Sequence, residues 1–123
     1  MALETTVEKY RQYIQDILTE RAQRANQHTD AEEYEVETIF DTIRDHYQLL
    51  YVGWQQYHRS FSCILHLDIR NGKIWIQHDG TEEGIANPLV ELGVPKHDIV
   101  LAFHDPGVRK YTDFGTGHEP IEA

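Results

Sequence analysis

The dipeptide Asn71-Gly72 lies between two segments in which apolar and polar residues alternate. Both residues tolerate the positive φ angles of a two-residue type I′ turn, so the pattern predicts a β-hairpin. The predicted register pairs Ile69 with Ile74, Asp68 with Trp75, Leu67 with Ile76, His66 with Gln77 and Leu65 with His78. A shift of one residue would bury Asp68 and Lys73, so the alternation specifies this pairing.

Further strands are predicted before this hairpin. Residues 33–42 alternate, with Tyr34, Val36, Thr38 and Phe40 on one face. Residues 47–54 are apolar on both faces, which is typical of a central strand covered on each side. Within residues 59–70, one face carries Phe61, Cys63, Leu65, Leu67 and Ile69. Because Cys63 falls in that apolar series, we predict an inert thiol buried in the core.

The N-terminal segment has a helical period instead. Its apolar residues recur at spacings of three and four, at Leu3, Val7, Tyr10, Ile14 and Ile17. Thr5 and Glu8 fit a capping box at the start of this helix, and Glu20 with Arg24 fits an i,i+4 ion pair near its end. Residues 26–30 are predicted to terminate it.

A second, shorter helix is predicted after the hairpin. It begins either at Thr81 as N-cap or near Asn87-Pro88, because proline lacks an amide hydrogen and suits the first helical turn. Gly93 ends it, and residues 99–103 form either a short strand or a last helical turn. The sequence thus predicts a single α+β domain over residues 1–123. It consists of an N-terminal helix, an antiparallel sheet of four or more strands and a second helix packed on the sheet, with a frayed tail at about 116–123.

Composition limits the classes of function. The chain has 11 Lys and Arg against 21 Asp and Glu, a formal net charge of −10, which disfavours direct nucleic-acid binding. Seven acids lie in residues 30–45 against Arg44 alone: Asp30, Glu32, Glu33, Glu35, Glu37, Asp41 and Asp45. This segment is either a solvated surface or one that steers a basic partner. A single cysteine and the lack of a long apolar run predict a cytoplasmic protein with no membrane segment.

Candidate chemistry is sparse. His66 and Asp68 share a strand face, but the predicted register places His78 on the opposite face, so two ligands are supplied where a metal site needs three or four. His97 and His104 could contribute only through tertiary contacts. We therefore expect no catalytic residue, no metal, no cofactor and no enzymatic activity.

Several runs of residues nevertheless resemble one known family. They are residues 45–54 (DHYQLLYVGW), Cys63, 66–69 (HLDI), 72–77 (GKIWIQ), 79–82 (DGTE), 93–96 (GVPK), 98–101 (DIVL) and 109–114 (RKYTDF). In this order they resemble the cyanobacterial XisI family, the fdxN element excision controlling factors, over about residues 4–115. The resemblance implies a small α+β fold and an accessory role in excision of the fdxN DNA element during heterocyst differentiation. It also implies a protein partner, an XisH-like protein or the excision recombinase, and supplies no catalytic residue.

Taken together, these observations predict a regulator that acts by protein–protein contact, with self-association into a homo-oligomer as an accompaniment. The candidate interface residues are Trp54, Tyr57, Trp75, Glu33, Glu35 and Glu37, because aromatic side chains and complementary charge are typical of interfaces. Trp75 could instead be covered by a helix. Two other functions stay open: a DNA-binding factor using Lys9, Arg11, Arg21 and Arg24, and a cryptic nuclease or hydrolase.

Overall fold

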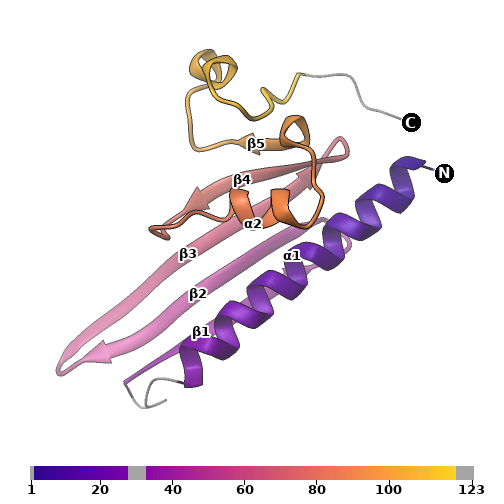
Figure 1. Ribbon diagram of the computed structural model, residues 1–123. Helices are drawn as coiled ribbons and strands as arrows, with labels where there is room; N and C mark the ends of the chain where they lie inside the picture. Colours follow the sequence, from indigo (N-terminus) through magenta and orange to yellow (C-terminus); the bar gives the residue numbers. More distant parts are fainter. Residues whose placement is uncertain (1, 28–32, 119–123) are drawn as a thin grey trace.

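The computed structural model describes residues 2–27 and 33–118 (Figure 1). Its helices and strands are, in chain order, α1 (Ala2–Gln27), β1 (Tyr34–Asp41), β2 (His46–Gln55), β3 (His58–Arg70), β4 (Lys73–Asp79), α2 (Ala86–Glu91), the 3-10 helix η1 (Lys96–Asp98), β5 (Ile99–Leu101) and the 3-10 helix η2 (Pro106–Tyr111). No helix among the described residues is long and apolar enough to span a membrane.

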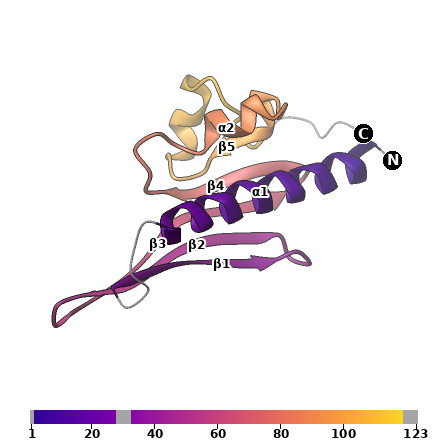
Figure 2. The ribbon, with the colours of Figure 1, turned by 60° about the horizontal axis from the view of Figure 1, so that its bottom comes forward.

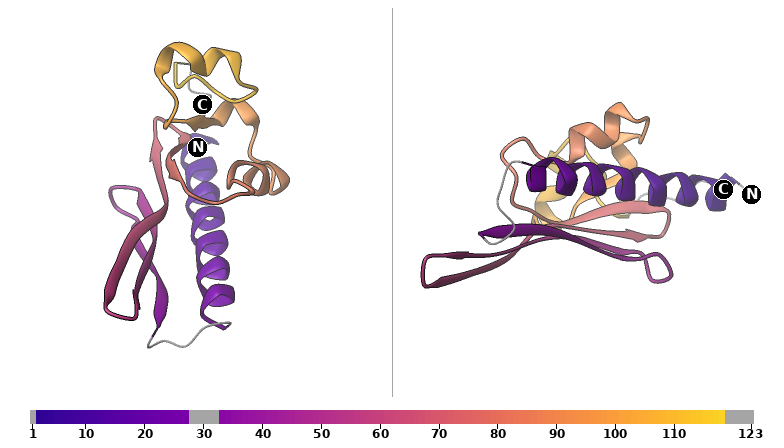
Figure 3. Two further views of the ribbon diagram at one scale, coloured as in Figure 1. Left: turned by 90° about the vertical axis from the view of Figure 1, so that its left-hand side faces the viewer. Right: turned by 90° about the horizontal axis from the view of Figure 1, so that it is seen from below.

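The five strands form one sheet in the order β1-β2-β3-β4-β5, and α1 and α2 lie on the same face of it (Figures 2 and 3). This arrangement confirms the predicted α+β class, with its N-terminal helix, its sheet and its second helix packed on that sheet. The first four strands are antiparallel, whereas β5 runs parallel to β4. The sheet is therefore mixed. The parallel pair arises because the connection through α2 carries the chain back to the end of the sheet at which β4 begins.

The core lies between the helices and the face of the sheet that they cover, which we call the inner face. Its buried side chains are Val36, Tyr47, Leu49, Leu65, Leu67, Ile69, Ile74, Ile76 and Ile99 from the strands, with Tyr10, Ile14, Leu18, Ala22, Ile85, Leu89 and Val94 from the helices and the loops on either side of α2. Apolar residues at every second strand position supply this face, as the sequence alternation predicts.

Helix α1 differs in detail from its prediction. Its buried line is Tyr10, Ile14, Leu18 and Ala22, at i,i+4 spacing, while Ile17 lies half-buried at the rim. The predicted capping box is wrong, because α1 begins at Ala2 and Thr5 is already inside the helix. The predicted pair of Glu20 and Arg24 is confirmed, with 2.7 Å between Arg24 Nη2 and Glu20 Oε2.

The hairpin at Asn71-Gly72 is confirmed, with φ angles of 53° and 74° at the two turn residues. The three predicted pairs nearest the turn are also confirmed, and the register then shifts between His66 and Leu67. Beyond that point His66 lies opposite His78, and Leu65 lies opposite Asp79. The two outermost predicted pairs are therefore wrong, because Gln77 is an extra residue in a β-bulge.

A second register shift changes the faces of β3. Leu49 pairs with Leu65, but Leu50 pairs with Cys63, so Ile64 is the extra residue. Beyond Ile64, the alternation moves Cys63 and Phe61 to the face that α1 does not cover. The prediction that Cys63 is buried in the core is wrong, since the residue is half-buried on that other face.

Strand β2 is an interior strand, as predicted, but the prediction that both of its faces are covered is not met: among the described residues, helices cover only one face (Figure 3).

The loop after β4 is organised by Asp79, whose carboxylate accepts hydrogen bonds from the amides of Thr81 and Ile85 at 2.9 and 2.7 Å. Helix α2 therefore starts at Ala86, next to Asn87-Pro88, and the alternative start at Thr81 is wrong. Of the two predictions for residues 99–103, the strand is confirmed.

One ion pair fixes α1 to the turn between β1 and β2. Arg11 Nε and Nη2 donate to the two carboxylate oxygens of Asp45 at 2.7 and 3.1 Å, and the Tyr47 hydroxyl donates to Asp45 Oδ1 at 2.8 Å. The Asp45 carbonyl oxygen also accepts from the Ile69 amide. Burial, and then the hydrogen bond to Asp45, raises the pKa of Tyr47 above its usual value, so the phenol stays protonated.

We expect the substitution Arg11→Met to lower the free energy of unfolding by about 1.5–3 kcal/mol, the usual contribution of hydrogen bonds to charged groups. It leaves the buried Asp45 carboxylate with the Tyr47 hydroxyl but no cation. The matched control is Arg24→Met on the same helix, whose exposed pair with Glu20 should contribute less than about 1 kcal/mol. Urea denaturation measures both, and equal losses would contradict the role assigned to Arg11.

Candidate functional site

The face of the sheet opposite α1, which we call the outer face, is the candidate functional surface. Its residues are Glu35, Glu37 and Ile39 from β1, His46, Gln48, Leu50 and Val52 from β2, Phe61, Cys63, His66 and Asp68 from β3, and Trp75 from β4. Figure 3 shows that both α-helices lie on the other side of the sheet. Neither α1 nor α2 therefore covers the side chains on this face (Figure 3).

A histidine–aspartate cluster occupies the end of the outer face where β2 begins and β3 ends. Asp68 Oδ1 lies 2.8 Å from His46 Nδ1 and 3.0 Å from His66 Nε2. Asp68 Oδ2 accepts hydrogen bonds from Arg70 Nη2 and Gln77 Nε2, both at 3.1 Å. The Asp68 side chain is only 2% exposed, whereas that of His46 is 47% exposed.

Asp68 is an anion at neutral pH. Burial by itself would raise the pKa of this carboxyl, but hydrogen bonds from His46 and His66, together with their charge interactions, more than offset burial and lower the pKa below its usual value. Gln48 Nε2 lies 3.4 Å from His66 Nδ1 and so contacts the other nitrogen of that ring. The carboxylate is therefore enclosed by donors on one side and by two imidazoles on the other.

The sequence indicated only part of this cluster. His66 and Asp68 were recognised as neighbours, but His46 was missed because it lies 22 residues before Asp68 and joins it only through β2–β3 pairing. The prediction for His78 is wrong. The bulge at Gln77 makes His78 the cross-strand partner of His66, so the two histidines share a face of the sheet. Donor atoms of His46, His66 and Asp68 all lie within 4.8 Å of one another, and these three are the only such metal-ligand group among the residues that the structure describes.

The other candidate histidines lie elsewhere. His97 Nε2 is 3.5 Å from Asp98 Oδ1, and Asp98 also accepts a hydrogen bond from the Tyr10 hydroxyl at 2.6 Å. The ring of His104 packs against Phe103, with 4.7 Å between ring centroids. Neither histidine joins the cluster around Asp68.

The opposite end of the outer face is aromatic and acidic. Trp54, Tyr57 and Phe61 are 49%, 99% and 65% exposed around the β2–β3 turn. Glu35 and Glu37 are exposed along the edge strand β1, and Glu33 is exposed just before it, where its carbonyl oxygen accepts from the Trp54 amide at 2.7 Å. A shallow hollow of about 540 Å³ lies here, lined by Glu33, Trp54, Gln55, Gln56 and His58. The structure thus brings five of the six candidate interface residues into one exposed region, which we call the hairpin surface.

Trp75, the sixth candidate, is placed differently. It is half-buried on β4, its Nε1 donates to the Arg70 carbonyl oxygen at 3.2 Å, and the Arg109 guanidinium lies 5.6 Å from its ring centroid. A Cβ atom at Gly117 would collide with the Trp75 ring, so the C-terminal segment packs directly on it. Trp75 is thus covered by the C-terminal segment and η2, and not by an α-helix. Residues 119–123 of the predicted frayed tail lie outside the described residues.

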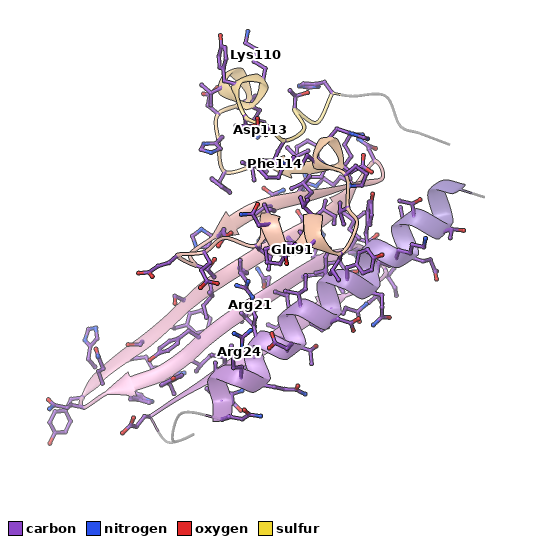
Figure 4. The ribbon with its side chains drawn as sticks, viewed as in Figure 1. Arg21, Arg24, Glu91, Lys110, Asp113 and Phe114 are labelled. Atoms are coloured by element: carbon purple, nitrogen blue, oxygen red, sulfur yellow. The ribbon has the colours of Figure 1, made fainter. Side chains whose placement is uncertain are left out.

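The cationic residues of α1 stand apart from the hairpin surface. Figure 4 shows Arg21 and Arg24 along α1, while Lys110, Asp113 and Phe114 lie at the far end of the molecule. Arg21, Arg24, Ala25 and Glu83 line a hollow of about 310 Å³. Arg24 is paired with Glu20 and Arg11 with Asp45, so acids interrupt this row of cations.

Comparison with known proteins identifies the family of this chain. Residues 4–116 match the family model described as XisI protein. The chain belongs to the XisI family. The match covers the helix, the whole sheet and both ends of the outer face, so it confirms the resemblance drawn from the sequence motifs.

Two solved structures show the same fold. An XisI-like protein from Anabaena variabilis is 43% identical to this XisI family member, with a TM-score of 0.79, covering 87% of this chain and 95% of that one. The fdxN element excision controlling factor XisI from Anabaena variabilis is 34% identical, with a TM-score of 0.76, covering 90% of this chain and 98% of that one. A search of curated proteins found no match.

The contact between Gly117 and Trp75 can be tested by Gly117→Ala. The new methyl group would collide with the indole ring, so we expect the C-terminal segment to detach and the Gly115 amide, which donates to Lys96 and Ile99, to exchange faster with deuterium. The matched control is Gly93→Ala, which also places alanine at positive φ but meets no atom within 4 Å. Unchanged exchange at Gly115 in Gly117→Ala would show that this segment does not cover Trp75.

Proposed function

We propose that this chain is a controlling factor for the excision of a DNA element and that it acts by binding a protein partner. The observation that carries the proposal is its similarity to the fdxN element excision controlling factor XisI, at 34% identity over 90% of this chain. A shared fold at this identity, together with the family match over residues 4–116, supports a shared role in excision control.

The hairpin surface supports action through protein contact. Nine large apolar side chains are more than a third exposed among the described residues, and three of them lie around the β2–β3 turn: Trp54, Tyr57 and Phe61. Aromatic residues dominate binding energy at protein interfaces. The adjacent carboxylates of Glu33, Glu35 and Glu37 provide a negative field that attracts a basic partner.

The partner that we propose is an XisH-like protein, the excision recombinase, or both, in the cytoplasm of a differentiating heterocyst. A protein that acts on DNA carries basic surface to neutralise phosphates. Such a surface complements the acidic residues beside the β2–β3 hairpin. Self-association through the same surface stays a prediction.

The distribution of charge favours an indirect role over DNA binding. The net charge is −10, and two arginines proposed for DNA contact, Arg11 and Arg24, are already paired with Asp45 and Glu20. A non-enzymatic mechanism follows from the same proposal, since binding and recruitment need no reacting group on this chain.

Reversal of charge tests the hairpin surface. We expect Glu33→Lys, Glu35→Lys and Glu37→Lys combined to slow association with the purified XisH-like protein or recombinase of the same host by about tenfold at low salt, because charge acts mainly on the association rate. The effect should shrink as salt screens the field. Stopped-flow fluorescence measures the rate. The control reverses Glu82, Glu83 and Glu91, three exposed acids outside this surface that change the net charge equally.

In the same assay, Trp54→Ala and Tyr57→Ala should raise the dissociation rate while far-UV circular dichroism stays unchanged. If the wild-type chain binds neither purified protein at micromolar concentration, or if both charge-reversed proteins slow association equally, the hairpin surface is not the binding site.

A second experiment separates indirect from direct action on DNA. We expect the purified chain to bind duplex DNA more weakly than the ~10⁻⁴–10⁻⁶ M dissociation constants typical of non-specific DNA binders at physiological salt, and to show no magnesium-dependent cleavage. Fluorescence anisotropy across a salt series measures the first, and gel electrophoresis measures the second. Micromolar binding that weakens steeply with salt would favour a DNA-binding factor, and cleavage would favour a nuclease.

A further inference from the structure

We infer that His46, His66 and Asp68 bind a divalent transition-metal ion on the outer face of the sheet. This inference goes beyond the proposed function, which requires no metal. It rests on three side chains of metal-ligand type, drawn from two neighbouring strands, whose donor atoms converge within 4.8 Å.

The spacing of the donor atoms is close to that of a metal site. Asp68 Oδ1 lies 2.8 Å from His46 Nδ1 and 3.0 Å from His66 Nε2. Zinc–ligand bonds of roughly 2.0–2.2 Å in a tetrahedral arrangement separate neighbouring donors by roughly 3.3–3.6 Å. Side-chain rotations that move Asp68 Oδ1 about half an ångström further from each imidazole nitrogen would therefore admit an ion among the three donor atoms, in place of the two hydrogen bonds.

The backbone holds these residues in a suitable arrangement. His46 and Asp68 are direct partners in the β2–β3 ladder, and His66 lies two residues from Asp68 on the same strand face. The two imidazole rings are 6.5 Å apart between centroids and nearly perpendicular, at 85°. Ligands carried by paired strands are positioned more precisely than ligands carried by loops.

Neighbouring side chains orient the ligands. Arg70 and Gln77 hold Asp68 Oδ2, which leaves Oδ1 directed at the imidazoles. Gln48 Nε2 lies 3.4 Å from His66 Nδ1, and when His66 Nε2 binds an ion, a flip of this amide turns Oε1 to accept a hydrogen bond from Nδ1–H. Arg70 also places a positive charge beside the carboxylate, which opposes cation binding and limits its affinity.

The donor set specifies the class of ion. Two imidazole nitrogens and one carboxylate oxygen suit Zn²⁺, Co²⁺, Ni²⁺ or Fe²⁺, whereas Mg²⁺ and Ca²⁺ prefer oxygen donors alone. Three protein ligands leave at least one coordination position for water or an external ligand. The His46 side chain is 47% exposed, so that position is reached from the outer face.

The experiment uses the full chain without an added histidine tag, treated with chelator and dialysed. Titration with Co²⁺, followed by its visible d–d absorption, should show one ion per chain, and Zn²⁺ should displace it. We expect His46→Gln and His66→Gln each to weaken Co²⁺ binding by at least about tenfold, as loss of a metal ligand does. The matched control is His58→Gln, an exposed histidine at the β2–β3 turn that should bind Co²⁺ as the wild type does.

Two further measurements separate a metal site from a purely structural hydrogen-bond cluster. Arg70→Gln should tighten Co²⁺ binding, because it removes the cation 3.1 Å from Asp68 Oδ2, whereas a structural cluster predicts no metal-dependent effect. Urea unfolding of the metal-free variants establishes that His46→Gln and His66→Gln remain folded. Absence of Co²⁺ and Zn²⁺ binding to the wild-type chain at micromolar metal, or binding that both cluster variants retain in full, would overturn the inference. Neither result would affect the partner-binding assays at the hairpin surface.

Discussion

Burial of the inner face beneath α1 is the constraint on which the rest of the structure depends. The helix presents one line of buried side chains, from Tyr10 to Ala22, to strands that supply an apolar residue at every second position. Arg11 and Asp45 fix the helix against the β1–β2 turn through a bidentate ion pair that is partly buried. Among the described residues, α1 and the short α2 both cover the inner face, and on the outer face η2 and the C-terminal segment cover only the region of Trp75 (Figure 3).

The outer face is consequently where function can reside, and two β-bulges decide its composition. The bulge at Ile64 moves Phe61 and Cys63 out of the core, which adds an aromatic residue near the β2–β3 turn. The bulge at Gln77 lets that amide reach Asp68. Bulges of this kind re-aim side chains next to functional sites. The result is an aromatic and acidic region at one end of the face and a histidine–aspartate cluster at the other.

These two regions suit different tasks. The hairpin surface combines exposed aromatic rings with carboxylates, a combination that favours recognition of a basic protein. The cluster around Asp68 instead gathers two imidazoles and a carboxylate held in place by Arg70 and Gln77. The proposed recruitment of a DNA-acting partner by this XisI family member agrees with the pairing of two α1 cations, Arg11 and Arg24, with acids.

The sequence by itself determined the features that depend on neighbouring residues: the helical period of α1, the Asn71-Gly72 turn with the three pairs beside it, and the family. Turn chemistry and alternation act over a few residues, so they can be read without knowing the fold. Only the tertiary structure decided that Leu18 is buried in place of Ile17, that β5 is parallel, that Gly117 covers Trp75 and that His46 meets Asp68. Each of these depends on how segments distant in sequence pack against one another, and a single extra residue in a strand reverses every side chain beyond it.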